Sequence, residues 1–256
     1  MAVLRRDSPV PAGPWFTDDV RAVQRAFDAA VQHNRTLGRL VADLTAVNAR
    51  AVVFGGWVRD HLASRALGHR IEPADIDLVV EGVSRARLYD LLPRGTSINA
   101  FNGFVCANDE FKMDVWCVQD TYTLAKRNLP FDVDLLPRTT VFTVESVIFK
   151  PAQCYGQSSV LDDGLADALR IGEINLAGGE LRFPAFQIGR VLQYGEKLGL
   201  RLGDDVLDLI KSTMADPAGF DEIERGILAF AHARLAKAAL DKLHEIAAGM
   251  IQPSAI

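Results

Sequence analysis

The alternation of apolar and polar residues divides the chain into a mixed first part and a helical second part. From Thr17 to Val47, apolar residues recur at helical spacing after a Thr17-Asp18-Asp19 capping signal, which predicts one long helix. A shorter helix is predicted over residues 58–66, and a loop over residues 68–73 leads to the next strand. Strands are predicted over residues 50–54, 75–80, 104–107, 111–118 and 139–149, with a hairpin turn at Asn108-Asp109.

The pattern changes near Phe183-Pro184. Residues 173–183 predict a second hairpin, which turns on Gly178-Gly179. Beyond it, helical spacing predicts helices over residues 186–198, 204–214 and 220–250. We therefore expect an α+β fold. A domain over residues 1–183 has a mixed β-sheet flanked by helices, and an all-helical domain over residues 184–256 follows it.

Two short motifs in the first domain carry candidate chemistry. The strand ending at Phe54 runs into Gly55-Gly56 and a predicted helix, and the next strand carries Asp75-Ile76-Asp77. Residues i and i+2 of a strand share a face, so the two carboxylates project together and repel each other unless a cation lies between them. Mg²⁺ prefers oxygen ligands and substrate phosphates, and a double glycine before a helix lets the backbone approach a phosphate. Together the motifs predict a site that binds a nucleoside triphosphate with magnesium.

A third carboxylate lies in the strand over residues 111–118. Alternation places Asp114 on the face opposite Met113 and Val115. A single acidic residue in an apolar strand is costly to bury unless it binds something. If this strand pairs with the Asp75 strand, Asp114 completes a cluster that can hold two magnesium ions. The alternative is that Asp114 lies on an open sheet face and pairs with Lys112 or another base.

Composition narrows the class of protein. The 256 residues are 49% hydrophobic and 24% charged, as in an ordinary globular protein. No apolar run has the length of a membrane span and residues 1–14 lack a signal-peptide core, so we expect a cytoplasmic protein without a membrane partner. Three widely spaced cysteines predict reduced thiols: Cys106, Cys117 and Cys154. The net charge of −5 argues against non-specific coating of nucleic acid.

The sequence Gly55-Gly56-x-Val58-Arg59-Asp60, followed by Asp75-x-Asp77, resembles the head domain of the polymerase-beta-type nucleotidyltransferases. More narrowly, it resembles the class II CCA-adding enzymes and bacterial poly(A) polymerases, which share a GGxVRD signature and a DxD pair. The resemblance implies magnesium-dependent transfer of NMP from an NTP to an RNA 3′ hydroxyl. It implies that Asp75 and Asp77 bind metal, and that the triphosphate is contacted by Gly55, Gly56 and Arg59. Asp60 would position the glycine loop or a ribose hydroxyl.

Weaker similarity continues along the chain. Residues 142–147 are similar to an FTINAM strand, with Glu145 in place of its asparagine, and residues 164–167 resemble a GGLxDL loop. Residues 186–200 resemble the first neck helix, in which that family pairs an acidic residue and an arginine with the incoming base. Those positions are Pro184 and Gln187 here, so the bidentate arginine is missing.

Four polar residues of this helix share one face at i, i+3, i+7 and i+10 spacing: Gln187, Arg190, Tyr194 and Lys197. They form either a different base-recognition face or a solvated stripe. Little sequence follows, so we expect the further helical domains with which that family clamps tRNA to be missing, and the acidic net charge fits this expectation.

Three hypotheses follow. The first is a magnesium-dependent nucleotidyltransferase that takes an NTP and a tRNA-like RNA 3′ end. The second is nucleotidyl transfer to a protein or a small molecule, as in a toxin or defence system. The third is a nucleotide-binding module that has lost catalysis, against which the complete carboxylate set argues.

Overall fold

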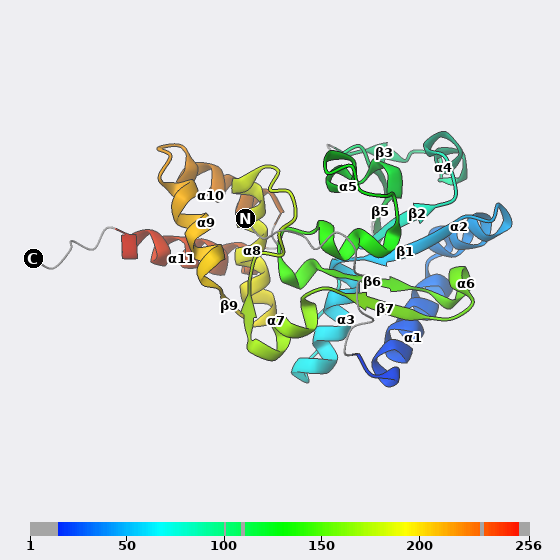
Figure 1. The fold of residues 1–256 in the computed structure, drawn as a ribbon, viewed down its shortest axis with the longest axis horizontal. Helices are drawn as coiled ribbons and strands as arrows, with labels where there is room; N and C mark the ends of the chain where they lie inside the picture. Colours follow the sequence, from blue (N-terminus) through cyan, green and yellow to red (C-terminus); the bar gives the residue numbers. More distant parts are fainter. Residues whose placement is uncertain (1–14, 100, 109–110, 231–232, 251–256) are drawn as a thin grey trace, which may run out of the picture.

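The computed structural model describes residues 15–99, 101–108, 111–230 and 233–250, and it has the expected α+β architecture (Figure 1). Within these ranges, a seven-stranded sheet has the order β3-β4-β5-β2-β1-β6-β7, in which β2 and β5 are parallel and the other neighbours antiparallel. Its strands are β1 (Arg50–Phe54), β2 (Ile76–Glu81), β3 (Ser97–Ile98), β4 (Phe104–Asn108), β5 (Phe111–Cys117), β6 (Val147–Lys150) and β7 (Ser159–Asp162).

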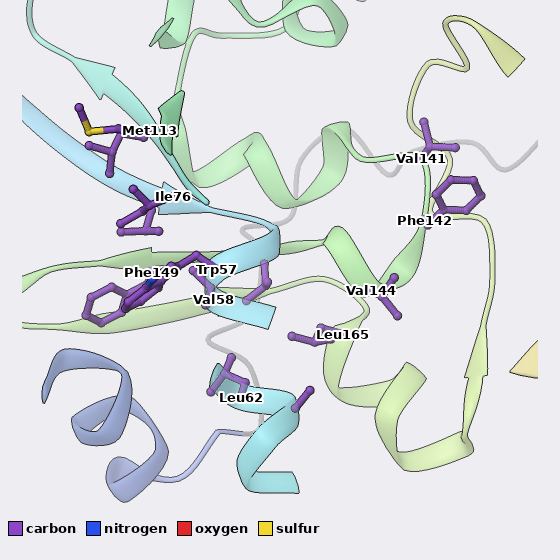
Figure 2. Close-up of a cluster of buried hydrophobic side chains, with 14 of the residues drawn as sticks. Trp57, Val58, Leu62, Ile76, Met113, Val141, Phe142, Val144, Phe149 and Leu165 are labelled. Atoms are coloured by element: carbon purple, nitrogen blue, oxygen red, sulfur yellow. The ribbon is translucent and has the colours of Figure 1, made fainter. Parts of the chain in front are cut away.

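One face of the sheet carries the main hydrophobic core. It is covered by α1 (Thr17–His33), α2 (Arg35–Ala46) and α3 (Gly56–Leu67) (Figure 1). The buried apolar residues of these helices belong to this core. Phe27 of α1 packs edge-on against Trp57 at 6.2 Å and Phe149 at 6.0 Å between ring centroids. Figure 2 shows how this core continues from β2 and β5 to α7 (Leu165–Ile171). Short helices α4 (Arg85–Leu91) and α6 (Ala152–Tyr155) complete this part of the chain.

The opposite face of the sheet carries a smaller cluster. Val52, Val79 and Ile148 point to this face. They pack against 3₁₀ helix η1 (Val118–Asp120), α5 (Tyr122–Lys126) and 3₁₀ helix η2 (Val133–Thr139). Because strand side chains alternate, Asp77 lies on the same face as Val79, at the end of β2 that begins the strand. Asp77, with Asp114 opposite it on β5, therefore lies at one end of the face that carries the smaller cluster.

The chain after Phe183 is mostly helical, although it was expected to be all-helical, because it also contains the two-residue strand β9 (Arg201–Leu202). Its described helices are α8 (Pro184–Leu198), α9 (Asp204–Met214), α10 (Gly219–Phe230) and α11 (Ala233–Met250) (Figure 1). Helices α8 and α10 approach backbone to backbone, since a Cβ on Gly189 would lie 2.9 Å from the Ile227 amide nitrogen. A side chain there would force the helices apart. In the described part of the chain, no helix has the length and hydropathy of a membrane span.

Two segments that were each predicted to be one helix contain two helices. The helix expected over residues 17–47 is two helices, because Asn34 leaves the helical conformation and its side chain accepts a 2.9 Å hydrogen bond from the Leu37 amide to cap α2. The helix expected over residues 220–250 is likewise divided into α10 and α11, and the residues between them lie outside the described part. The hairpin of β4 and β5 is confirmed, although Asp109 of its turn lies outside the described residues.

Two strand predictions are wrong in part or in full. Of residues 139–149, only those from Val147 onward form a strand, because residues 143–145 form 3₁₀ helix η3 (Thr143–Glu145). The predicted hairpin over residues 173–183 does not form. Instead β8 (Glu173–Ile174) pairs in parallel with β9 (Arg201–Leu202). Gly179 donates its amide to Thr140 O at 2.8 Å, and a Cβ on Gly179 would lie 2.1 Å from that oxygen. The glycine pair therefore permits a close backbone contact with residue 140 rather than a hairpin turn.

The break at Asn34 predicts a measurable capping contribution. Replacing Asn34 by Ala removes the acceptor for the Leu37 amide and should lower the free energy of unfolding by about 1 kcal/mol. Urea denaturation measures this difference. Asn34→Ser is the matched control, because serine keeps a capping oxygen and should retain most of the stability. Equal losses in both variants would show that the cap does not stabilise the helix junction.

Candidate functional site

The motifs singled out in the sequence meet at one end of three neighbouring strands. Phe54, the last residue of β1, lies opposite Asp77 of β2. Asp77 in turn lies opposite Asp114 of β5. The glycine turn, the DxD pair and the third carboxylate are thus adjacent in space. The three-carboxylate prediction required the Asp114 strand to pair with the Asp77 strand, and β5 does pair with β2.

A lysine lies between two of these carboxylates. The Lys112 ammonium contacts Asp75 Oδ2 at 3.0 Å and Asp114 Oδ2 at 2.8 Å. The pairing of Asp114 with Lys112, which the sequence left as an alternative, is therefore present as well. Asp75 and Asp114 together raise the pKa of Lys112 against the opposing effect of its partial burial. In the described ranges, no three His, Cys, Asp or Glu side chains are arranged as the ligands of a metal ion. The three-carboxylate metal site stays a prediction.

Asp77 is the carboxylate of the cluster whose pKa is raised by its surroundings. Its partial burial, followed by the charges of Asp75 and Asp114, raises its pKa to about 8. The positive charges of Arg190 and Lys112 oppose this rise. A carboxylate in this position favours a nearby cation, because further positive charge offsets the repulsion from its neighbours.

The glycine turn gives the backbone a shape that a side chain would resist. Gly55 has φ 62° and ψ −114°, in a region that favours glycine, and its amide donates to Val147 O at 2.9 Å. Helix α3 begins at the next residue, so the first amides of the helix follow directly after the strand that ends beside Asp77. This arrangement can bind a phosphate through backbone N–H groups.

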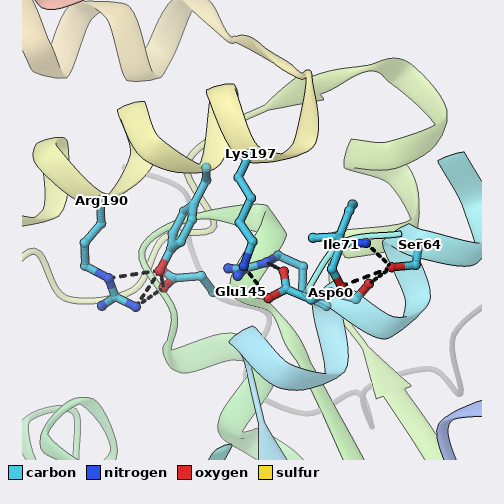
Figure 3. Close-up of polar contacts among 8 residues, drawn as sticks. Asp60, Ser64, Ile71, Glu145, Arg190 and Lys197 are labelled. Atoms are coloured by element: carbon cyan, nitrogen blue, oxygen red, sulfur yellow. Dashed lines mark hydrogen bonds and ion pairs between the residues drawn. The ribbon is translucent and has the colours of Figure 1, made fainter. Parts of the chain in front are cut away.

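Asp60 forms buried ion pairs with Arg59 of its own helix and with Lys197 of α8 (Figure 3). Asp60 accepts from Arg59 Nε at 2.8 Å and from Lys197 Nζ at 2.7 Å, and the Asp60 side chain is 2% exposed. Burial opposes the charge of Arg59, but Asp60 more than compensates and raises the arginine's pKa. Arg59 Nη1 is buried and has no hydrogen-bond partner among the described residues. One donor of this arginine is therefore available to a ligand.

A second polar group follows along α8. Arg190 Nη2 donates to Glu145 Oε1 at 2.6 Å, and the Tyr194 hydroxyl donates to the same oxygen at 2.8 Å (Figure 3). The Arg59 guanidinium stacks over the Tyr194 ring at 4.4 Å, which joins the two groups into one network. Arg190, Tyr194 and Lys197 therefore point from α8 toward the part of the chain that forms the sheet, and they are not a solvated stripe.

Gln187 is the fourth residue of that face, and it is only 9% exposed. Its Oε1 atom has no hydrogen-bond partner among the described residues. A buried amide oxygen without a partner costs free energy unless a ligand or water supplies a donor. Its role in base recognition stays a prediction.

Two contributors to the site were not assigned by the sequence analysis. Glu145 was noted only as a departure from an asparagine, and the structure shows it to be the partner of Arg190 and Tyr194. Lys112 was named only as an alternative partner of Asp114. Alternation offered a signal, because Lys112 and Asp114 share one strand face.

Comparison with known proteins identifies the fold. No protein-family model matches the sequence, and no curated protein sequence matches it. A solved CCA-adding enzyme in complex with ATP is similar over 90% of this chain and 54% of its own, with a TM-score of 0.57 and 15% identity. The chain has the fold of the CCA-adding enzymes.

Two further solved structures are similar to this chain over most of its length. A tRNA nucleotidyltransferase complexed with a primer tRNA and an incoming ATP analogue matches 82% of this chain and 60% of its own, with a TM-score of 0.57 and 18% identity. An apo CCA-adding enzyme matches 90% of this chain and 53% of its own, with a TM-score of 0.58 and 15% identity. The chain thus spans somewhat more than half the length of these structures.

The buried ion pairs predict a strong dependence of stability on Asp60. Asp60→Ala leaves Arg59 and Lys197 without their shared carboxylate and should lower the free energy of unfolding by about 3–5 kcal/mol. Lys197→Met leaves Asp60 paired with Arg59 and should cost less, about 1.5–3 kcal/mol. Chemical denaturation measures both. The double variant should cost less than the sum of the single variants, and strict additivity would contradict the coupling.

Proposed function

We propose that this chain is a magnesium-dependent nucleotidyltransferase that moves NMP from an NTP to an acceptor hydroxyl, with an RNA 3′ end as acceptor. The observation that carries the proposal is the register of three strands. It places the Gly55 turn, Asp77 and Asp114 side by side in the fold of the CCA-adding enzymes. The CCA-adding enzyme bound to ATP and the tRNA nucleotidyltransferase bound to a primer tRNA support an NTP and an RNA as the substrates.

The donor set fits a magnesium ion. Asp75, Asp77 and Asp114 offer carboxylate oxygens, and the pKa of Asp77, raised to about 8, indicates that further positive charge is favoured there. Lys112 already supplies part of that charge between Asp75 and Asp114. When bound, magnesium would supply activation of the acceptor hydroxyl and neutralisation of the triphosphate.

The residues of the chain have distinct roles in this proposal. The backbone amides after Gly55 bind the phosphates, and the unpartnered Arg59 Nη1 donates to them. Asp60 holds Arg59 in place through the 2.8 Å hydrogen bond. The acceptor oxygen bonds to the α-phosphorus, the bond from that phosphorus to the bridging oxygen breaks, pyrophosphate leaves and the hydroxyl proton passes to solvent. Such transfer needs mainly positioning and charge neutralisation.

Base recognition is assigned to Gln187, with Arg190 and Tyr194 holding its helix in place. Gln187 has the free amide oxygen, whereas Arg190 is committed to Glu145 and Tyr194. An amide can both accept hydrogen bonds from the edge of a base and donate hydrogen bonds to it. A glutamine can therefore supply hydrogen bonds to the base as the missing arginine would, but without a positive charge.

The proposal predicts that transfer depends on Asp77. The protein is incubated with each α-labelled NTP, magnesium, total cellular RNA and protein extract. Label in an RNA band is expected, and Asp77→Asn should lower it at least 100-fold, because one of the oxygens that bind metal is lost. Asp208→Asn, an exposed aspartate of α9, is the matched control and should keep full activity.

The position of the label decides the acceptor. Label in a protein band would show that the acceptor is a protein. Label in a small molecule would show that the acceptor is a small molecule. Either result would favour the second hypothesis over an RNA acceptor. Absence of label from every fraction, with intact protein by circular dichroism, would contradict the proposed function and favour a non-catalytic nucleotide-binding module.

Lys112 predicts a measurable effect on magnesium affinity. Lys112→Met removes a positive charge next to Asp75 and Asp114 and should lower the magnesium dissociation constant on the order of tenfold, an effect limited by the solvent exposure of the lysine. The magnesium dependence of the melting temperature measures it. Lys242→Met removes an exposed lysine of α11 and should leave the dissociation constant unchanged. An unchanged constant in both variants would place the bound ion away from Lys112.

A further inference from the structure

Three exposed aromatic side chains surround one arginine beside the carboxylates. Phe101 is 48% exposed, Tyr122 is 44% exposed and Phe183 is 51% exposed. The Arg182 guanidinium lies 5.8 Å, 5.0 Å and 4.8 Å from the centroids of these three rings, respectively. Phe101 and Phe183 also contact each other edge-on at 6.1 Å. We call Phe101, Tyr122, Phe183 and Arg182 the aromatic platform.

The platform is formed by segments that are distant in the sequence. Phe101 lies in the loop between β3 and β4, Tyr122 begins α5 and Phe183 caps α8. Exposed aromatic rings give up the favourable free energy of burial, so three of them gathered at one place call for a ligand. The backbone of Phe183 adds to this cost, because its φ of 58° and ψ of 70° lie in the left-handed region that a bulky residue avoids.

The platform adjoins the catalytic carboxylates. The Asn99 side chain accepts from the Phe101 amide at 2.9 Å and donates to Asp114 Oδ1 at 3.4 Å, so it connects the Phe101 loop to the cluster. On the other side of the platform, the ring centroids of Phe101 and Phe186 lie 6.2 Å apart. The Arg190 guanidinium carbon lies 5.9 Å from the centroid of the Phe186 ring. The platform is thus connected to Asp114 on one flank and contacts α8 on the other.

The order of the strands decides which substrate lies on the platform. The glycine turn follows β1, on one side of β2, whereas Asp114 and the Phe101 loop belong to β5 and the β3–β4 connection, on the other side. In phosphoryl transfer the attacking and leaving oxygens lie roughly in line across the phosphorus. A triphosphate held at the glycine turn therefore requires the acceptor to approach from the side of the platform.

Charge and ring chemistry identify the acceptor class. The contacts of Arg182 are with aromatic rings, and within the described ranges no carboxylate pairs with it. A cation among exposed aromatic rings suits a single-stranded nucleic acid, whose bases stack on rings and whose phosphates attract arginine.

We infer that the aromatic platform binds the 3′-terminal nucleotides of a single-stranded nucleic-acid acceptor. A base stacks on Phe101 and Phe183, and Arg182 contacts the adjacent phosphate. The inference rests on the proposed function, and it deepens that function by assigning the residues that position the acceptor.

Fluorescence anisotropy with a labelled ten-nucleotide single-stranded RNA tests the assignment. Phe183→Leu and Phe101→Leu keep apolar bulk without a planar ring, and each should weaken binding about 5- to 150-fold. Phe183→Trp should retain binding, since it keeps a planar ring. Arg182→Gln should reduce the slope of log affinity against log salt by about 0.7, the value for one phosphate contact in a single strand. Leu228→Ala, which alters an exposed apolar residue of α10 outside the platform, is the matched control.

Separate readouts distinguish failure of this inference from failure of the proposed function. Binding of Mg²⁺–NTP, followed by the shift in melting temperature, should be the same in the platform variants and the unaltered protein. In transfer assays the KM for RNA should rise and the KM for NTP should stay constant. RNA binding that is unchanged by Phe183→Leu and Phe101→Leu would overturn the platform alone. If the variants bind RNA as well as the unaltered protein but bind a protein partner or a second copy of the chain more weakly, the platform is a protein-binding surface and the inference is overturned.

Discussion

The buried carboxylate of Asp60 is the interaction on which the arrangement of the two parts of the chain depends. It binds an arginine of its own helix, α3, and a lysine of α8, so these two helices share one counter-ion. Removing one member of such a buried group is destabilising, because it leaves charge that its remaining partners compensate less fully. The orientation of Arg59 at the glycine turn is therefore set by the packing of α8.

The carboxylates at the start of β2 impose the opposite constraint, because they bring like charges together. Asp77 faces Asp75 and Asp114 while partly buried, and positive charge near it comes from Lys112 and Arg190. One of these cations belongs to the sheet and the other to α8. The electrostatic balance of the cluster thus involves both the sheet and α8, the helix that carries Gln187.

The sequence was sufficient to pick out the candidate site residues that the fold brings together, because these residues stand in local patterns. The double glycine, the DxD pair and Asp114 are recognised from strand alternation and helix starts, and the register of β1, β2 and β5 places them together. The prediction was less successful where distant contacts decide the structure. The Gly178-Gly179 pair packs against Thr140, which no local turn signal reveals, and the roles of Glu145 and Lys112 depend on partners brought in by folding. The division at residues 183–184 stays a prediction, and β8 pairs with β9 across it.

The charge balance of α8 explains why a neutral residue occupies position 187. Arg59, Arg190 and Lys197 already direct positive charge to the interface, and the carboxylates that pair with them are Asp60 and Glu145. A further arginine at residue 187, one turn from Arg190, would add a buried cation where the acidic residue of the related pattern is Pro184. Glutamine avoids that cost and retains a donor and an acceptor, and its free Oε1 leaves the acceptor available. Pro184 and Gln187 therefore add no buried charge to α8, and the base recognition that we propose for Gln187 relies on neutral hydrogen bonds.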